Sequence, residues 1–172
     1  MPPGDGGDLR PVSSDDAAWI GPALRRWRRS YRWQFRSAPP SRERVRALLD
    51  DPDVVRQAIV TAGSGAPADG AVLQISALGL AHGAAELSVL ADPQVPELVR
   101  GQLDRFVRQA FAGLALRKLS LRALDGELDV AGCLPAARRV GVLVEHDRRR
   151  EGTYDDLVVH ELWREDVDGA AG

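Results

Sequence analysis

The sequence predicts an α+β (mixed α/β) fold with one parallel junction between strands, and one stretch carries most of this prediction. Residues 85–90 form a strand candidate that stops at Asp92-Pro93, residues 95–114 form an amphipathic helix candidate, and residues 117–123 alternate as a second strand. A strand, a helix and a strand in close succession form a crossover that makes the two strands parallel. This unit also places a helix N-terminus beside the carboxyl end of a strand, where anionic ligands usually bind.

The strands that flank the crossover are expected to be antiparallel. Residues 56–62 and 71–78 precede the strand at 85–90 and are separated from it by short turns, which is typical of a meander. Residues 141–146 and 153–162 predict a terminal hairpin, joined by a charged loop. The sheet is therefore predicted to be largely antiparallel.

Helices are predicted before the first strands and between the later ones. Ser13 to Asp16 has the composition of a helix N-cap followed by acids, so a helix is expected from about Ala17. A second helix is expected to begin at Ser41. Residues 125–131 are predicted to be a loop, and 135–140 at most a short helix, because Pro135 disfavours helical geometry at the residue before it.

Length and composition predict one globular domain. The chain has 172 residues, of which 44% are hydrophobic and 28% charged, with a net charge of −2. We expect a domain over 9–165 with disordered tails at 1–8 and 166–172. A single cysteine suits a reducing compartment and no apolar run approaches the roughly 20 residues of a membrane span, so a cytoplasmic location without membrane contact is expected.

The order of these elements, with the residues that punctuate them, resembles the GNAT superfamily of acyl-CoA-dependent N-acyltransferases. Within it the chain looks most like the ribosomal-protein N-terminal acetyltransferase type. The matching residues are Leu9-Arg10-Pro11, Asp15-Asp16-Ala17, 70–75, 85–88 through Asp92-Pro93, 119–122, 138–142 and 154–159. The resemblance implies a three-layer α/β/α fold with acetyl-CoA as co-substrate and a small-molecule or peptide amine as acceptor.

The loop that binds the coenzyme A pyrophosphate in this family departs from the family pattern here. The usual Gln/Arg-x-x-Gly-x-Gly/Ala run is replaced by residues 94–101, which contain one glycine, Pro96 without an N–H, and Glu97, whose charge would repel a phosphate. The phosphate loop is therefore degenerate. The positions that the resemblance assigns to the cofactor are Val89, Leu90, Val99, Arg100, Gly101 and Gln102.

Two residues are candidates for the family's proton transfers. Glu86 is the candidate general base, since it lies on the central strand where the site would open. The family's asparagine and tyrosine positions hold Val130 and Ala137, and the serine used by the ribosomal-protein type is Cys133, which becomes the candidate acid. The alternatives are an ion-paired strand carboxylate for Glu86 and a small buried side chain for Cys133.

A basic and aromatic segment at residues 25–46 is the candidate acceptor side, because the first helices frame the acceptor in this family. Trp27, Tyr31 and Arg32 are the predicted substrate-binding residues. Two other interpretations stay open, namely nucleic-acid contact through arginine and stacked aromatics, and an amphipathic helix with solvated arginines. The net charge of −2 argues against nucleic acid as the partner of the whole molecule.

Two functions are compatible with these residues. The first is an N-acyltransferase that moves an acyl group, most simply acetyl, from acetyl-CoA to an amine. The second is a catalytically degenerate GNAT-fold binding or interaction module without acyl transfer, which the altered loop, Val130 and Ala137 favour. No metal is expected, because His82, His146 and His160 have no ligand spacing. A homodimer is one expected form.

Overall fold

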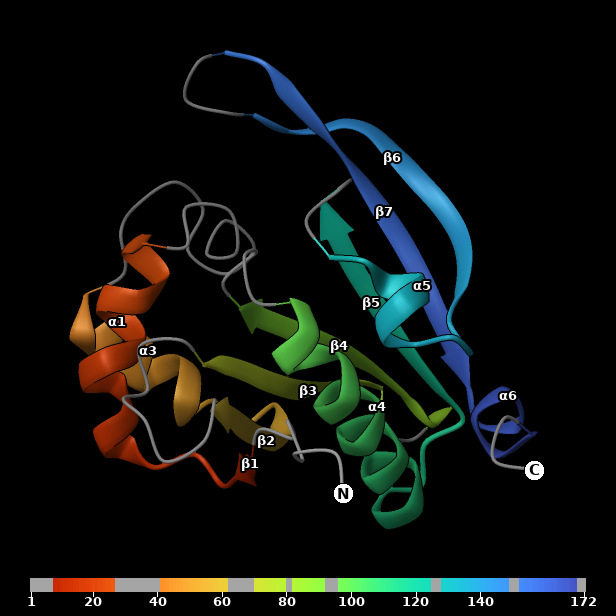
Figure 1. Cartoon of the computed structure of the whole chain (residues 1–172), viewed down its shortest axis with the longest axis horizontal. Helices are drawn as coiled ribbons and strands as arrows, with labels where there is room; N and C mark the ends of the chain where they lie inside the picture. The colour runs from red at the N-terminus through yellow and green to blue at the C-terminus, as the bar shows by residue number, and fades with distance from the viewer. Residues whose placement is uncertain are drawn as a thin grey trace, which may run out of the picture.

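A seven-stranded sheet forms the centre of the computed structural model, which describes residues 8–26, 41–61, 70–79, 82–91, 96–124, 128–148 and 152–169. The strand order is β1-β2-β3-β4-β5-β7-β6 (Figure 1). The strands are β1 (Asp8–Arg10), β2 (Val54–Thr61), β3 (Ala71–Gly79), β4 (Ala84–Ala91), β5 (Lys118–Leu124), β6 (Arg138–Arg148) and β7 (Tyr154–Trp163). Only the β4–β5 pair is parallel among these strands, which confirms the predicted mixed sheet.

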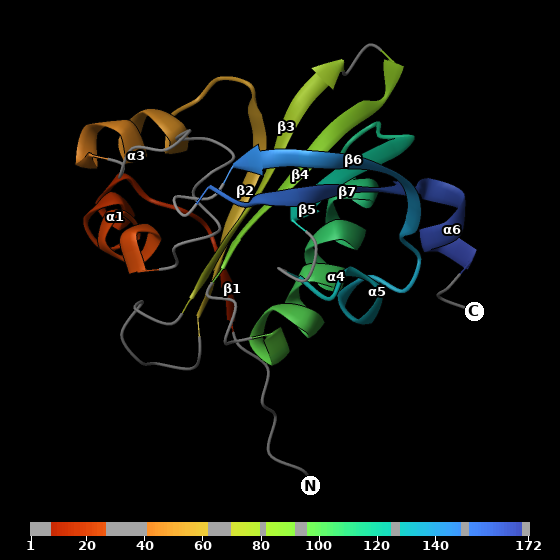
Figure 2. The same ribbon diagram turned by 90° about the horizontal axis from the view of Figure 1, so that it is seen from above.

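Helices cover both faces of the sheet. They are α1 (Ala17–Arg26), α3 (Arg42–Leu49), α4 (Pro96–Gly113), α5 (Val130–Cys133) and α6 (Arg164–Gly169), with a short 3-10 turn η1 (Ser14–Asp16) before α1. Figures 1 and 2 show α4 and α5 on one face, and α1 and α3 on the other. The predicted three-layer α/β/α arrangement is therefore confirmed.

Alternation along the strands divides the core into two parts. In β2, Ala58 and Val60 pack in the core beneath α4, whereas Ile59 packs in the core beneath α1 and α3. In β4, Leu87 belongs to the α4 side and Leu90 to the α1 and α3 side. Successive side chains of a strand point to opposite faces, so each strand contributes to both cores.

The helix starts follow the local signals of the sequence. Ser13 precedes η1, and its N–H donates to Asp16 Oδ2 at 2.8 Å, so the predicted cap is present. Ser41 caps α3, where its hydroxyl accepts from the Arg44 N–H at 3.2 Å. Pro96 opens α4, at the position where a missing N–H costs nothing.

The C-terminal end of α4 is held by an arginine that sequence reasoning did not identify. Arg164 donates through Nη2 to the carbonyls of Phe111 and Leu114, at 2.5 and 3.0 Å, and through Nε to Leu116 at 2.8 Å. A helix leaves its last carbonyls without helical partners, and a cation there also suits the helix dipole. Arg164 therefore joins the start of α6 to the end of α4.

Several bounds expected from the sequence differ from the structure. The short helix is Val130–Cys133 rather than 135–140, because Asp129 caps it by accepting from the Gly132 N–H at 3.0 Å; part of the predicted loop 125–131 is therefore helical. Strand β6 already starts at Arg138. Residues 166–169 belong to α6 instead of a tail, since Val167 is buried and its carbonyl accepts from Arg108. In the expected N-terminal tail, Asp8 belongs to β1, while residues 1–7 and 170–172 lie outside the described part.

Candidate active site

The parallel pair β4–β5 separates partway along its length. The register joins Ala84 to Lys118 through Leu87 to Leu121 and then ends. Strand β4 continues to Ala91 in register with β3, and β5 continues to Leu124 in register with β7. Figure 1 shows the two arrows diverging. Beyond Leu87, the edge of β4 that faces β5 has no ladder partner in β5, so the sheet opens while both halves stay intact.

Glu86 lies at the start of this opening, on the face that carries α1 and α3. It alternates with Ala85 and Leu87, whose side chains pack beneath α4. Its side chain is 23% exposed and has Arg122 Nε at 3.6 Å from Oε1. The parallel register places Ser120 opposite Glu86, and Arg122 is the first β5 residue beyond the last paired position, Leu121. A half-buried carboxylate therefore sits where the two strands part.

Further polar residues share the face of Glu86, and sequence reasoning missed them. Gln74 is fully buried, donates through Nε2 to Gln57 Oε1 at 3.2 Å, and lies opposite Ser88 in the sheet. Gln57 in turn donates to the carbonyl of Leu49 at 2.8 Å, which joins the row to α3. A buried glutamine within an apolar strand was the available signal, because such a residue must be hydrogen-bonded.

The start of α4 holds four of the predicted cofactor positions, in different environments. Val99 is buried in the core, and Gln102 is 9% exposed, with its Oε1 lacking a hydrogen-bond partner among the described residues. Arg100 is exposed, and at Gly101 an added Cβ would meet nothing within 4 Å. Residues 92–95, which include the first part of the predicted loop before α4, lie outside the described ranges.

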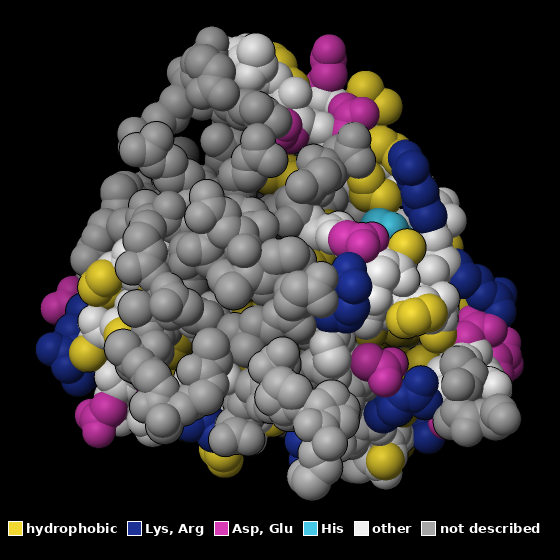
Figure 3. Space-filling model, in the orientation of Figure 1, with side chains coloured by type: hydrophobic (Ala, Val, Ile, Leu, Met, Phe, Trp, Pro, Cys, Tyr) yellow, Lys and Arg dark blue, Asp and Glu magenta, His cyan; other side chains and the backbone are white. Residues whose placement is uncertain are grey.

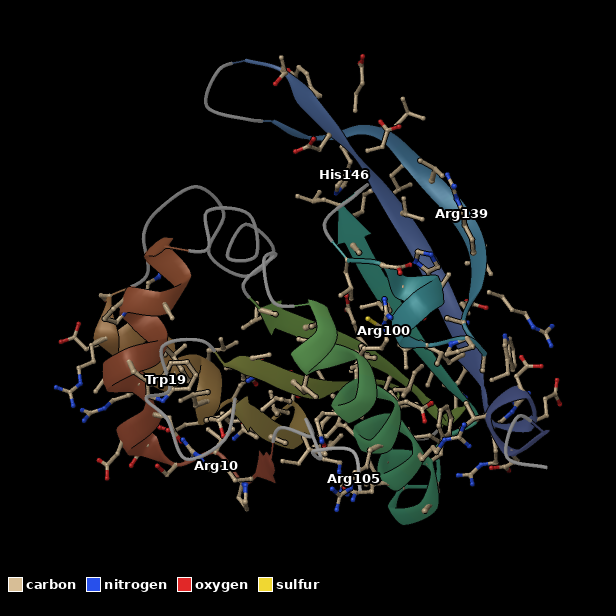
Figure 4. The ribbon with its side chains drawn as sticks, in the orientation of Figure 1. Arg10, Trp19, Arg100, Arg105, Arg139 and His146 are labelled. Atoms are coloured by element: carbon tan, nitrogen blue, oxygen red, sulfur yellow. The ribbon has the colours of Figure 1, made fainter. Side chains whose placement is uncertain are left out.

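Arg100 links the start of α4 to the start of α5. Its Nη2 lies 3.6 Å from Asp129 Oδ2, in an ion pair whose side chains are 44% and 58% exposed (Figure 4). Asp129 also caps α5, and Gly132 leaves room for this cap, because a Cβ there would clash with the Asp129 carboxylate. Exposed pairs of this kind contribute at most about 1 kcal/mol to stability.

Val89, Leu90 and Cys133 contribute their side chains to the two cores. Leu90 packs toward α1 and α3, and Val89 packs against the α4 core. Cys133 is 1% exposed in the same core as Leu119 and Leu121, so the structure places it on the other side of the sheet from Glu86. The third group of predicted residues, Trp27, Tyr31 and Arg32, lies outside the described residues.

Two classes of feature are missing from the described part of the chain. No helix there is long and apolar enough to cross a membrane. No group of three His, Cys, Asp or Glu side chains in the same ranges is placed to hold a metal ion.

The divided parallel pair, with a long helix that begins just after β4, belongs to the fold of the GNAT acetyltransferases. Solved structures with this fold include the spermidine N-acetyltransferase of Vibrio cholerae in complex with CoA and spermine, at 17% identity and a TM-score of 0.74, covering 93% of this chain and 96% of that one. Mutant forms of the spermidine/spermine N-acetyltransferase of the same organism give 17% identity and a TM-score of 0.75, covering 96% and 98%. A dodecameric structure of that enzyme in an intermediate state gives 18% and 0.73, with the same coverage.

No protein-family model and no curated protein sequence matches this chain. At 17–18% identity the structural matches establish the fold. They do not distinguish the ribosomal-protein type from other members of the superfamily.

Proposed function

We propose that this protein is an N-acyltransferase, most simply an N-acetyltransferase, that moves an acyl group from acetyl-CoA to an amine. The observation that carries the proposal is the separation of β4 from β5 beyond Leu87 and Leu121 within a sheet that is otherwise continuous. A strand edge opened in this way can hydrogen-bond an extended chain that contains amide groups. The thioester arm of coenzyme A is such a chain.

The residues near the opening fit this co-substrate mainly through their backbone. The side chains of Val89, Leu90 and Val99 are committed to the cores, so their contribution would be N–H and C=O groups. The first turn of α4 offers N–H groups without helical partners, and Arg100 is an exposed cation beside them. The buried Gln102 Oε1 is an acceptor without a hydrogen-bond donor among the residues that the structure describes. Acetyl-CoA, when bound, supplies an acyl group activated as a thioester.

Glu86 is the proposed general base. An amine is an ammonium ion at neutral pH and must lose a proton before its nitrogen can attack a carbonyl. Glu86 accepts that proton, directly or through water, and the amine nitrogen then bonds to the acyl carbon while the bond from that carbon to sulfur breaks. The nitrogen loses its second proton as the amide forms, and the departing sulfur takes up a proton. The step therefore balances without Cys133, the donor predicted from the sequence, whose side chain lies in the core on the other side of the sheet from Glu86.

The test is acyl transfer by the wild type, Glu86→Gln and Glu165→Gln, measured as thiol release with a panel of amines. Glu165 is an exposed α6 residue and serves as the matched control. We expect kcat/KM to fall about 100- to 10,000-fold in Glu86→Gln and to stay unchanged in Glu165→Gln. Calorimetry should show acetyl-CoA bound by all three. Absence of both acetyl-CoA binding and thiol release would overturn the proposal.

The acceptor class is supported by the structural matches and by the sequence resemblance. Amine acceptors are supported by the spermidine N-acetyltransferases of the same fold, and a peptide amine by the sequence resemblance to the ribosomal-protein type. Trp27, Tyr31 and Arg32 remain the proposed acceptor contacts from the sequence. Acetylation of spermidine and of short peptides in parallel assays separates the two acceptor types.

A second candidate is a GNAT-fold binding module without acyl transfer. Two observations favour it, the start of α4 at Pro96, which removes one N–H from the helix end, and the burial of Cys133. This function predicts ligand binding by the wild type without turnover. Turnover that disappears in Glu86→Gln would eliminate it.

We further propose a cytoplasmic protein that forms a homodimer. The single cysteine supports the first part. The second is supported by exposed apolar side chains on the edge strand β6, which include Val140 at 51%, Leu143 at 46% and Val144 at 72%; Figure 3 shows hydrophobic side chains at the surface along this hairpin. Light scattering gives the molar mass of the wild type and of the Val144→Glu variant, which keeps Val140, and so tests the assembly.

A further inference from the structure

Arg122 is a cation at the opening with unused hydrogen-bonding capacity among the described residues. Its Nε is 3.6 Å from Glu86 Oε1, beyond the length of a hydrogen bond, and its side chain is 44% exposed. Lys118, four residues earlier on the same face of β5, is different. Its Nζ donates to Glu161 at 2.6 Å and lies over the Trp163 ring. The guanidinium of Arg122 can therefore still donate to an anion in a bidentate arrangement.

Glu86 and Arg122 place opposite charges side by side at the point where β4 and β5 separate. The proposed chemistry brings the acceptor nitrogen to Glu86, so whatever is bonded near that nitrogen comes close to Arg122. A second positive group there would be repelled, whereas a negative group would form the complementary pair. An acceptor that carries its ammonium and a carboxylate on one carbon atom, or on neighbouring ones, matches both charges at once.

We infer that the acceptor is an amine that also carries a carboxylate, and that Arg122 determines this specificity by binding the carboxylate. The inference rests on the proposed acyl transfer with Glu86 as base. The carboxylate has two sources with the same chemistry, the α-carboxylate of a free amino acid and the acidic side chain beside the amino terminus of a peptide.

The experiment compares acceptors that differ only in this charge. Free alanine, glutamate and methionine are each paired with the corresponding carboxamide, and a tripeptide amide with Asp at its first position is paired with its Asn counterpart. Binding is measured by calorimetry in the presence of coenzyme A, and kcat/KM by thiol release with acetyl-CoA. The proteins are the wild type, Arg122→Gln, Arg122→Lys and the control Arg105→Gln, an exposed α4 position away from the opening (Figure 4).

We expect the wild type and Arg105→Gln to favour the charged member of at least one pair by about tenfold or more, which is the usual effect of a charge-assisted hydrogen bond. Arg122→Gln should abolish the preference and Arg122→Lys should restore part of it. A structural role for the ion pair would weaken both members of each pair equally and leave the ratio unchanged, and that result overturns the inference. Equal binding of both members by the wild type also overturns it.

The outcome is separable from that of the proposed function. Acetyl transfer to amines and carboxamides without a charge preference supports the proposed acyltransferase activity and excludes the specificity role of Arg122. Binding that depends on the carboxylate and on Arg122, without any thiol release, supports carboxylate recognition by Arg122 and excludes the proposed acyl transfer. The pair of readouts therefore decides the two claims independently.

Discussion

Arg10 and Asp16 form a bidentate ion pair that ties β1 to the start of α1. Arg10 Nη1 and Nη2 donate to the two Asp16 carboxylate oxygens at 2.9 and 2.6 Å. The same carboxylate accepts from the Ser13 N–H and from Trp19 Nε1, each at 2.8 Å (Figure 4). The Ser13 hydroxyl also donates to this carboxylate, at 3.2 Å. Asp16 is 5% exposed, and these five donors replace the water that it loses. The Asp16 side chain therefore joins β1, the residue before η1 and the first turn of α1.

Substitution of Asp16 by asparagine should therefore destabilise the protein. The amide cannot accept from all of these donors and leaves Arg10 without its counter-charge, which we expect to lower the free energy of unfolding by about 2–3 kcal/mol. The midpoint of thermal unfolding should fall by about 5–10 °C. Asp15→Asn, at an exposed neighbour, should change stability by less than about 0.5 kcal/mol. Equal effects of the two changes would contradict this role.

The contribution of Asp16 should also depend on pH. Burial raises the pKa of this carboxyl, but the hydrogen bonds from Arg10, Ser13 and Trp19 outweigh burial and hold the pKa well below its ordinary value. The stabilisation is therefore complete above the unfolded-state pKa of about 3.9 and is lost as the pH falls toward the lower folded-state value. Urea unfolding at pH 7 and at successively lower pH should show the difference between wild type and Asp16→Asn shrinking below about pH 4.

Much of the fold could be predicted because local signals and the tertiary structure agree. The alternation in β5, the caps Ser13 and Ser41, and the amphipathic pattern of α4 all point to the elements that form. The exceptions arise from long-range contacts. Nothing near Arg164 in the sequence indicates that it caps the end of α4, some fifty residues earlier. The cap of α5 by Asp129 was readable locally and was missed beside the stronger signal of Pro135.

The candidate site could be predicted less completely. Glu86 was predicted from its position on the central strand and stays a prediction, whereas Arg122 is brought beside it only by the parallel register of β4 and β5. Cys133 was predicted from its spacing along the family pattern. Its place in the core on the opposite side of the sheet from Glu86 depends on which face α5 covers, which the spacing does not give. The order of helices and strands can be predicted from the sequence more readily than the face of the sheet on which a side chain from a distant element lies.

His160 should make the stability fall on mild acidification. Burial lowers the pKa of its imidazole, and the positive charge of Arg139 lowers it further. A folded-state pKa below the unfolded value of about 6.5 means that protonation favours the unfolded chain, so stability decreases as the pH falls below that value. His160→Gln should remove this dependence, and Arg139→Gln should reduce it. An NMR titration of the imidazole that gives an ordinary pKa would contradict the prediction.

Substitution of Cys133 distinguishes a buried structural side chain from a proton donor. Because the side chain is 1% exposed within the α4 core, we expect Cys133→Ala to cost about 1 kcal/mol of stability and to leave kcat within about twofold. Thermal unfolding and thiol release measure the two effects. A loss of kcat above about tenfold in Cys133→Ala that Cys133→Ser restores would instead assign the proton transfer to this position.

Substitution by alanine should have opposite effects on stability at two glycines, Gly132 in α5 and Gly101 in α4. At Gly132 a Cβ would clash with the Asp129 carboxylate, so Gly132→Ala should break the cap of α5 and lower stability by about 1 kcal/mol or more. At Gly101, inside α4, a Cβ would meet nothing, and alanine should raise stability by about 0.5–1 kcal/mol through its higher helix propensity.

The same Gly101→Ala variant tests whether acetyl-CoA approaches the α4 backbone. If the co-substrate lies against this turn, the added methyl group occupies space that it needs, and affinity should fall while stability rises. A merely structural position would show the gain in stability alone. Calorimetric titration with acetyl-CoA, run beside urea unfolding of the same sample, separates these results, and unchanged affinity in Gly101→Ala would exclude Gly101 from the binding surface. Opposite signs for stability and affinity in one variant cannot arise from damage to the fold, so the pair of measurements bears directly on the ligand.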